Sequence, residues 1–267
     1  MTTTRPTLVL LPGLAADAVM WRAQLDALAG WQPQVADVNG RHDSIEAMAA
    51  ALLAQYPGEL VLCGASMGGI VAMEAARQAP QRLRGLALLG TNARPETEDM
   101  RALREAAIEL FAKGQVREVI EPNVALAFHP DQASDAALTG AYLDFVLRAG
   151  ADQLIRQNRA IMARPDARLH LPQLRCPTLV MCGDADQLTP PDCSHEIAAL
   201  VPGAAAGDGE RILNFYRGGD GRPHVMTSPT TGEGFVDGPA FLSFSRKSST
   251  FDEKKSTRPG EPQIGRA

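Results

Sequence analysis

With 267 residues, 45% of them hydrophobic, and a formal net charge of −5, the chain fits one globular domain with an insertion. Its scattered Lys and Arg residues argue against a nucleic-acid partner, and the absence of a long apolar run argues against a membrane span. Residues 1–6 lack the layout of a signal peptide, and the four cysteines form no C-x-x-C pair. We therefore expect a cytoplasmic protein with reduced thiols and, because the five histidines show no ligand spacing, neither a metal nor a cofactor.

The first part of the chain alternates short apolar runs with helical patterns. The runs are typical of buried parallel strands, because both faces of such strands are covered. Strands are predicted at 7–11, 33–38, 60–63 and 83–89. Helices are predicted between them at 20–28, from an Asp43 cap onward, and at 69–78. This alternation favours an α/β fold with a mostly parallel, doubly wound sheet.

The strand signal stops at Pro95 and resumes at Thr178. Between these points, helical patterns are predicted at 100–111, 116–127, 136–149 and 153–162. An insertion here lies above the carboxyl ends of the strands, where such sheets carry their sites. We therefore interpret residues 95–164 as a helical lid, the alternative being plain helical packing with no role at the site. Residues 1–94 and 165–225 then form the core.

The pentapeptide Gly64-Ala65-Ser66-Met67-Gly68 connects a predicted strand to a predicted helix. A glycine-flanked turn in this context forces the serine into a strained conformation, because side chains at the glycine positions would collide with neighbouring elements. The Ser66 hydroxyl is then exposed at the top of the sheet, and the Met67 N–H points the same way. This arrangement predicts a nucleophile with half of an oxyanion hole, although a Gly/Ser turn also occurs by chance.

Two further segments follow predicted strands. Asp186 lies in Gly183-Asp-Ala-Asp-Gln-Leu-Thr-Pro190 after the strand that starts at Thr178. A carboxylate there is suited to orient a histidine base, so we predict Asp186 as the acid, with Asp184 as the alternative and a plain turn as the other reading. Gly13 turns the chain after the first strand, and the Leu14 N–H is predicted to complete the oxyanion hole.

These three segments, L-L-P-G-L (10–14), C-G-A-S-M-G-G (63–69) and C-G-D-A-D-Q-L-T-P (182–190), resemble the α/β-hydrolase family. The resemblance is to its lid-bearing carboxylesterase, lactonase and C–C hydrolase group and covers about residues 7–204. It implies Ser66 as nucleophile, Asp186 as acid, and the Leu14 and Met67 N–H groups as oxyanion donors. Pro12-Gly13 stands where many relatives carry His-Gly, and the usual first two strands are absent.

The histidine of the family does not stand at its usual place, which the resemblance puts near Asn214. His224 follows a plausible strand at 212–216, although later than expected, and is the predicted base; the alternative is a loop histidine with no role. His195 lies in a predicted helix and reads as a surface residue. His42, His129 and His170 read as structural or solvated, with His129 also a possible substrate contact.

The composition changes near residue 205. Alanine occurs 39 times in residues 1–205 and 3 times in residues 206–267. The tail is rich in Gly, Ser, Thr and Pro, so residues 226–267 are predicted to be atypical and poorly ordered. Three explanations compete: a divergent ending that still supplies His224, a shifted reading frame, which we favour as a hypothesis, or a natural loss of function.

The sequence thus predicts a serine hydrolase that acts on a small or medium carboxylic ester or lactone through an acyl-enzyme. The alternatives are a C–C bond hydrolase or a cofactor-free haloperoxidase-like enzyme, and a catalytically silent protein on a hydrolase scaffold. The expected partner is the small-molecule substrate. The acyl and alcohol preference and the oligomeric state do not follow from the sequence.

Overall fold

A computed structural model describes residues 5–209, 215–217 and 223–225. Its main sheet has six strands in the order β2-β1-β3-β4-β5-β6, and every neighbouring pair is parallel. The strands are β1 (Thr7–Leu11), β2 (Gln34–Val35), β3 (Leu60–Ala65), β4 (Leu83–Leu89), β5 (Thr178–Gly183) and β6 (Ala205–Gly209). The predicted α/β architecture with a parallel sheet is confirmed.

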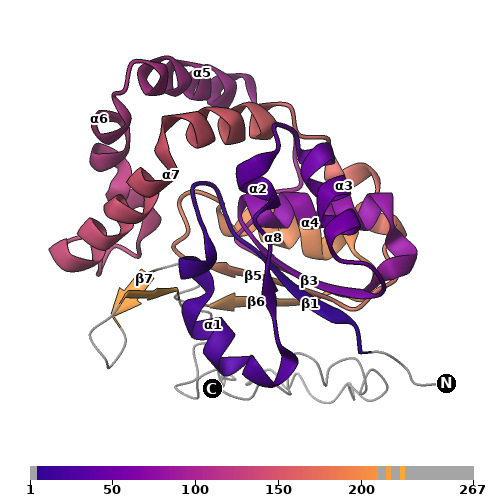
Figure 1. Cartoon of the computed structure of the whole chain (residues 1–267). Helices are drawn as coiled ribbons and strands as arrows, with labels where there is room; N and C mark the ends of the chain where they lie inside the picture. Colours follow the sequence, from indigo (N-terminus) through magenta and orange to yellow (C-terminus); the bar gives the residue numbers. More distant parts are fainter. Residues whose placement is uncertain (1–4, 210–214, 218–222, 226–267) are drawn as a thin grey trace, which may run out of the picture.

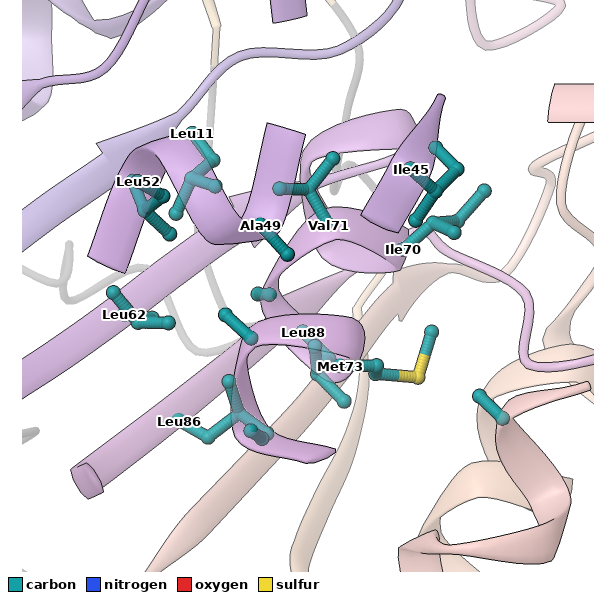
Figure 2. Packing of buried hydrophobic residues seen from close by; sticks show 14 of the residues in the cluster. Leu11, Ile45, Ala49, Leu52, Leu62, Ile70, Val71, Met73, Leu86 and Leu88 are labelled. Carbon is teal, nitrogen blue, oxygen red and sulfur yellow. The ribbon is translucent and has the colours of Figure 1, made fainter. Parts of the chain in front are cut away.

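Alternate residues of the strands face two separate apolar layers, because side chains along a strand point to opposite faces. Val9 and Leu11 of β1 belong to the layer with α3 (Ile45–Gln55), α4 (Met67–Gln78) and α8 (Pro191–Leu200). Figure 2 shows Ile45, Ala49 and Leu52 of α3 and Val71 of α4 packed with Leu62, Leu86 and Leu88 of the sheet. The continuous apolar runs seen in the sequence follow from this double coverage.

The opposite layer contains Leu8 and Leu10 of β1 together with Met20 and Trp21. The predicted helix at 20–28 is divided into a 3-10 helix, η1 (Ala18–Trp21), and α1 (Arg22–Ala27). Asp17 begins η1, since its carboxylate accepts the Val19 N–H at 2.8 Å. Thus η1 directly follows the loop that leaves β1.

A helical insertion separates β4 from β5. It contains α5 (Glu98–Ala112), α6 (Val116–Ile120), the 3-10 helix η4 (Glu121–Ala127) and α7 (Ala136–Met162). Figure 1 shows α5, α6 and α7 together on the side toward which the strand arrows point. Phe111, Phe145 and Leu154 of the insertion share one apolar cluster with Ala65 and Leu89, at the carboxyl ends of β3 and β4.

Helix α7 is interrupted at Gly150, where φ is +76°. Glycine is suited to this position because a positive φ carries little steric penalty without a Cβ atom. The two helices predicted at 136–149 and 153–162 match the two parts of α7 on either side of this residue. The boundaries of the lid and the assignment of a lid role stay predictions.

Two local predictions need correction. Ser44, not Asp43, caps α3, because the Ser44 hydroxyl accepts the Ala47 N–H at 3.1 Å. The strand predicted at 33–38 is limited to residues 34–35, since Val38 already begins α2 (Val38–Arg41). The predicted tail, 226–267, lies outside the described residues, and so do residues 212–214 of the strand predicted before His224.

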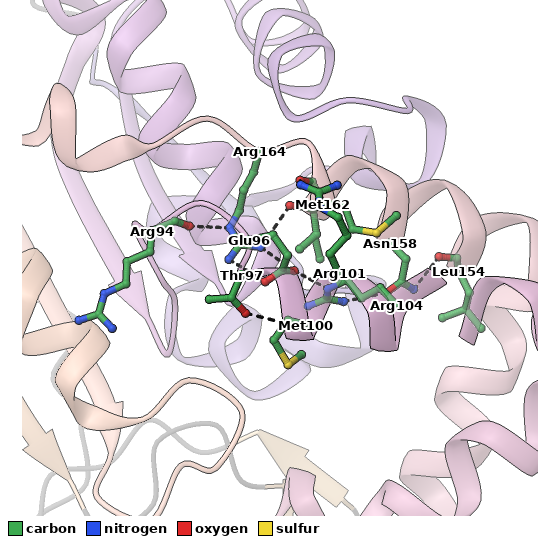
Figure 3. Close-up of polar contacts among 11 residues, drawn as sticks. Arg94, Glu96, Thr97, Met100, Arg101, Arg104, Leu154, Asn158, Met162 and Arg164 are labelled. Carbon is green, nitrogen blue, oxygen red and sulfur yellow. Dashed lines mark hydrogen bonds and ion pairs between the residues drawn. The ribbon is translucent and has the colours of Figure 1, made fainter. Parts of the chain in front are cut away.

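The buried carboxylate of Glu96 joins the two ends of the insertion (Figure 3). Glu96, at the start of the insertion, contacts Arg164, at its end, at 2.9 Å, and Arg104 at 2.5 Å. Glu96 is 4% exposed and Arg164 5%. Arg164 also donates to the Arg94 carbonyl at 2.7 Å. Burial alone would raise the pKa of Glu96, but the hydrogen bonds from Arg164 and Arg104 outweigh it and hold the pKa below its usual value.

Glu96→Gln is expected to lower the free energy of unfolding at neutral pH by about 3 kcal/mol, because it leaves buried guanidinium charge without its counter-ion. Because folding lowers the pKa of Glu96, the stabilisation by its carboxylate is present above the usual value of 4.5 and is lost as the pH falls below it. The difference between wild type and variant should therefore shrink in acid. Urea unfolding across this pH range measures it.

Glu59→Gln is the matched control. Glu59 pairs with Arg84 on the surface, with side-chain exposures of 44% and 48%, and exposed pairs contribute at most about 1 kcal/mol. Equal losses of stability in the two variants at neutral pH would contradict the role given to Glu96.

Candidate active site

Ser66 stands at the turn between β3 and α4 with φ +51° and ψ −117°. A residue with a Cβ atom rarely adopts this backbone conformation, so contacts with neighbouring residues must hold Ser66 in it. The Ser66 N–H donates to the Leu89 carbonyl at 2.9 Å, and the Thr91 hydroxyl donates to the Ser66 carbonyl at 2.7 Å. Both contacts come from β4 and the residues after it, so the neighbouring strand fixes the turn. The strained turn predicted from the pentapeptide is confirmed.

The glycines around Ser66 are required by close backbone contacts. A Cβ atom on Gly64 would lie 2.3 Å from the Gly68 carbonyl oxygen, and one on Gly68 would lie 2.1 Å from the Leu11 carbonyl oxygen. These distances are far below van der Waals contact. The start of α4 is therefore packed directly on the turn and on the end of β1, which places the serine beside the loop that follows β1.

That loop, residues 12–16, offers one free donor near Ser66. The Gly13 N–H contacts the Met20 sulfur at 3.5 Å, and the Ala16 N–H donates to the Gly13 carbonyl at 3.2 Å. The Ala15 N–H donates to the Gln157 side-chain oxygen at 2.8 Å. Within the described part of the chain, the Leu14 N–H has no such acceptor. A Cβ atom on Gly13 would lie 3.5 Å from the Ser66 Cβ, so the loop lies against the serine.

The Met67 N–H is the corresponding donor on α4. It belongs to the first turn of the helix, where N–H groups have no partner within the helix. The next two N–H groups with partners, those of Gly69 and Ile70, both donate to the Ser66 carbonyl, at 2.9 and 3.3 Å. No acceptor for Met67 occurs among the residues that the structure describes. The two donors predicted for an oxyanion hole are thus both available.

Asp186 lies just beyond the end of β5, two strands from β3 in the sheet. Its carboxylate accepts the N–H groups of Leu188 and Thr189 and the Thr189 hydroxyl, each at 2.9 Å. Burial raises the pKa of Asp186 and outweighs these hydrogen bonds. The alternative acid, Asp184, is exposed. Asp186 is therefore held in one orientation at the same edge of the sheet as Ser66.

Four of the five histidines have described side chains, and these lie in other surroundings. His42 ends α2, and the Nδ1 atom of His129 accepts the Asp131 N–H at 3.3 Å. His170 donates to the Met73 carbonyl at 3.2 Å, and burial lowers the pKa of its imidazole. His195 is exposed on α8. The contacts of His129 and His170 agree with their reading as structural or solvated, and the reading of His42 stays a prediction.

His224 is described only by its backbone. It lies in β8 (Pro223–Val225), which pairs antiparallel with β7 (Phe215–Arg217), so that His224 stands opposite Tyr216. Strand β8 lies against η1 and α1, and β7 against α7. The hairpin is therefore close to the segment that follows the loop at 12–16. The imidazole itself is outside the described part, so the role of His224 as base stays a prediction.

Two residues that support this site, Asn39 on α2 and Gln157 on α7, do not stand out in the sequence. Both are buried polar residues that contact the loop at 12–16. Their only signal in the sequence is a polar residue inside an otherwise apolar helical pattern, which is too common to single out. The described residues contain no group of His, Cys, Asp or Glu that could hold a metal ion, and no helix among them is long and apolar enough to cross a membrane.

The sequence is similar to known hydrolases. The family described as serine aminopeptidase, S33, matches residues 28–207. A pimeloyl-[acyl-carrier protein] methyl ester esterase of Aromatoleum aromaticum is 29% identical, over 74% of this chain and 99% of that protein. The biotin biosynthesis bifunctional protein BioHC of Cellvibrio japonicus is also 29% identical over 74% of this chain, and the chain spans 41% of its length.

The fold is similar to that of a solved esterase. A thermophilic esterase from Thermogutta terrifontis matches with a TM-score of 0.68 and 26% identity, over 77% of this chain and 81% of that one. Like the sequence relatives, it covers about three quarters of the chain. The family match ends two residues after residue 205, where the composition of the chain changes.

Proposed function

The chain belongs to the family of α/β-hydrolases described as serine aminopeptidase, S33, and from this premise we propose that it cleaves small or medium carboxylic esters or lactones through an acyl-enzyme. The observation that carries the proposal is the position of Ser66, strained at φ +51° beside the available N–H groups of Leu14 and Met67. A strained serine next to two unpaired donors is the arrangement that acyl transfer needs.

In the proposed mechanism, the Ser66 hydroxyl oxygen attacks the substrate carbonyl carbon while its proton passes to the base. The Leu14 and Met67 N–H groups donate to the oxyanion that forms on the carbonyl oxygen. When the tetrahedral intermediate collapses, the bond to the leaving oxygen breaks, and the base returns the proton to that oxygen. Water then attacks the acyl-enzyme by the same route, which releases the carboxylic acid and restores Ser66.

We assign the role of base to His224 and that of orienting acid to Asp186. The position of the β7–β8 hairpin next to η1 and α7 supports the first assignment, because both elements contact or follow the loop at 12–16. The raised pKa of Asp186 supports the second. A partly buried carboxylate that no cation faces among the described residues is hard to ionise, and an imidazolium beside it would supply that cation.

The relatives suggest the first substrates to test. A pimeloyl-[acyl-carrier protein] methyl ester esterase and a solved esterase are among the similar proteins. We therefore propose methyl esters of medium-chain carboxylic acids as model substrates. p-Nitrophenyl butyrate is the chromogenic substrate for routine assays. Turnover of these by the full chain, measured by acid release or by nitrophenolate absorbance, tests the proposal.

His224→Ala is expected to lower kcat for p-nitrophenyl butyrate at least about 10²-fold, because general-base catalysis contributes about 10²–10⁴-fold. His195→Ala, the same substitution on the exposed face of α8, is the control and should keep the wild-type rate. Equal rates in both variants would remove His224 from the mechanism. A wild-type chain that neither turns over esters nor reacts with a fluorophosphonate would instead support a silent protein on this scaffold.

A further inference from the structure

A pair of buried amide side chains joins the helical insertion to the loop at 12–16. The Gln157 side-chain oxygen accepts the Ala15 N–H at 2.8 Å, and the Gln157 amide donates to the Asn39 carbonyl at 3.0 Å. The Asn39 amide in turn donates to the carbonyls of Gly13 and Pro12, at 3.1 and 3.3 Å. These contacts form a continuous chain from α7 through α2 to both sides of Leu14.

Packing alone does not account for these two residues. Gln157 is 0% exposed and Asn39 5%. Burying an amide is unfavourable unless its hydrogen bonds are made, and an apolar side chain of similar volume would fill the same space without that penalty. Here the Asn39 side chain bonds only the main chain of the loop, and the Gln157 side chain bonds the main chain of the loop and of Asn39. Their hydrogen bonds therefore stabilise the loop rather than the apolar core.

The loop needs such support because its conformation is unfavourable. Ala15 has φ +59°, a left-handed conformation that residues other than Gly, Asn and Asp rarely adopt. The hydrogen bond from its N–H to Gln157 holds it there. With the Pro12 and Gly13 carbonyls bound on one side and the Ala15 N–H on the other, the peptide that carries the Leu14 N–H has little freedom to turn.

We propose that Gln157 and Asn39 are positioning residues that aim the Leu14 N–H at the oxyanion. This inference rests on the proposed function, and it adds a role for the insertion. Gln157 lies after the Gly150 break, and its neighbour Arg156 donates to the Gly40 carbonyl at 2.9 Å. The second half of α7 is thus fixed to α2 and forms part of the support of the site. Preorganised donors of this kind stabilise a transition state without reorganisation during the reaction.

Gln157→Met tests the inference. Methionine is close in volume and favours a helix, but it cannot replace the amide, so the Ala15 N–H loses its partner. We expect kcat for p-nitrophenyl butyrate to fall between about 10- and 100-fold, with KM nearly unchanged, because only the transition state carries the oxyanion. Affinity for a phenylboronic acid, which forms a tetrahedral adduct with the serine, should fall in parallel. The pH profile of kcat should stay the same.

Asn158→Met is the matched control on the same helix. Asn158 is also buried, at 6% exposure, but its side chain bonds Arg104 and the Leu154 carbonyl instead of the loop. We expect this variant to lose stability and, at a temperature where it is folded, to keep the wild-type kcat and boronic-acid affinity. This difference separates positioning from a general loss of packing.

The outcomes distinguish the inference from the proposed function. If wild type is active and folded Gln157→Met keeps its kcat and boronic-acid affinity, the positioning role is wrong and the proposed function stands. If both buried-amide variants lose kcat equally, the effect is structural and the positioning role is also overturned. If wild type lacks ester turnover and boronic-acid binding, the proposed function fails first, and the positioning role fails with it.

Discussion

Ser66→Ala is expected to lower kcat for ester hydrolysis by about 10⁴-fold or more, because no other group of the site can form the acyl-enzyme. The change removes only the hydroxyl oxygen. Alanine keeps the Cβ atom and with it the strained φ of +51°, and the main-chain contacts to Leu89 and Thr91 remain. The free energy of unfolding should therefore stay within about 0.5 kcal/mol of wild type. Initial rates and urea unfolding measure the two quantities.

Ser134→Ala is the matched control, since Ser134 is an exposed serine in the insertion. It should keep the wild-type rate and should label with a fluorophosphonate to the same extent as wild type. Intact mass should show one adduct on wild type and on the control, and none on Ser66→Ala. Residual turnover by Ser66→Ala close to the wild-type rate, in a preparation free of wild-type protein, would contradict the acyl-enzyme.

The sheet was predictable because its strands are covered on both faces. Burial on both faces requires continuous apolar runs such as Thr7–Leu11 and Leu83–Leu89, and these coincide with β1 and β4. The turn at Ser66 was predictable for a related reason. A Cβ atom at its glycine positions would lie 2.1 or 2.3 Å from a main-chain oxygen. The close packing therefore requires glycine, and the glycines are visible in the sequence.

Features that depend on contacts between distant segments were not predictable. Gln157 and Ala15 are 142 positions apart, and no local pattern links them. The cap of α3 is a local feature that the sequence also leaves open, because Asp43 and Ser44 are both residue types that cap helices and only the hydrogen bond to Ala47 decides between them. The proposed base, His224, is the extreme case, because it lies beyond the part of the chain that the family match covers.

The reading-frame hypothesis for the end of the chain stays open and is tested directly. Sequencing the gene across codons 195–230, together with the intact mass of the protein, decides whether the frame is continuous. An unbroken frame removes the hypothesis and leaves His224 as the histidine to test. A shifted frame would remove His224 from the native chain, while the proposed roles of Ser66, Leu14 and Met67 would be unaffected.

Gly68→Ala is expected to destabilise the fold by at least about 4 kcal/mol, an exceptional loss for a single methyl group. Its Cβ atom would lie 2.1 Å from the Leu11 carbonyl oxygen and 2.7 Å from that of Pro12. Both are main-chain atoms at the end of β1, so no rotation of a side chain relieves the clash. Either α4 moves away from the sheet or the loop at 12–16 moves away from Ser66. Thermal unfolding and the yield of folded protein measure the loss.

Gly140→Ala is the same chemical change, but it is expected to have the opposite effect on stability. Gly140 lies within α7, and a Cβ atom there meets nothing within 4 Å. Alanine should therefore stabilise the helix by about 0.5–1 kcal/mol, through its higher helix propensity. If Gly68→Ala were as stable as Gly140→Ala, α4 would not be packed on β1 as described. Any folded fraction of Gly68→Ala should also hydrolyse esters poorly, because the movement that relieves the clash separates the Leu14 N–H from Ser66.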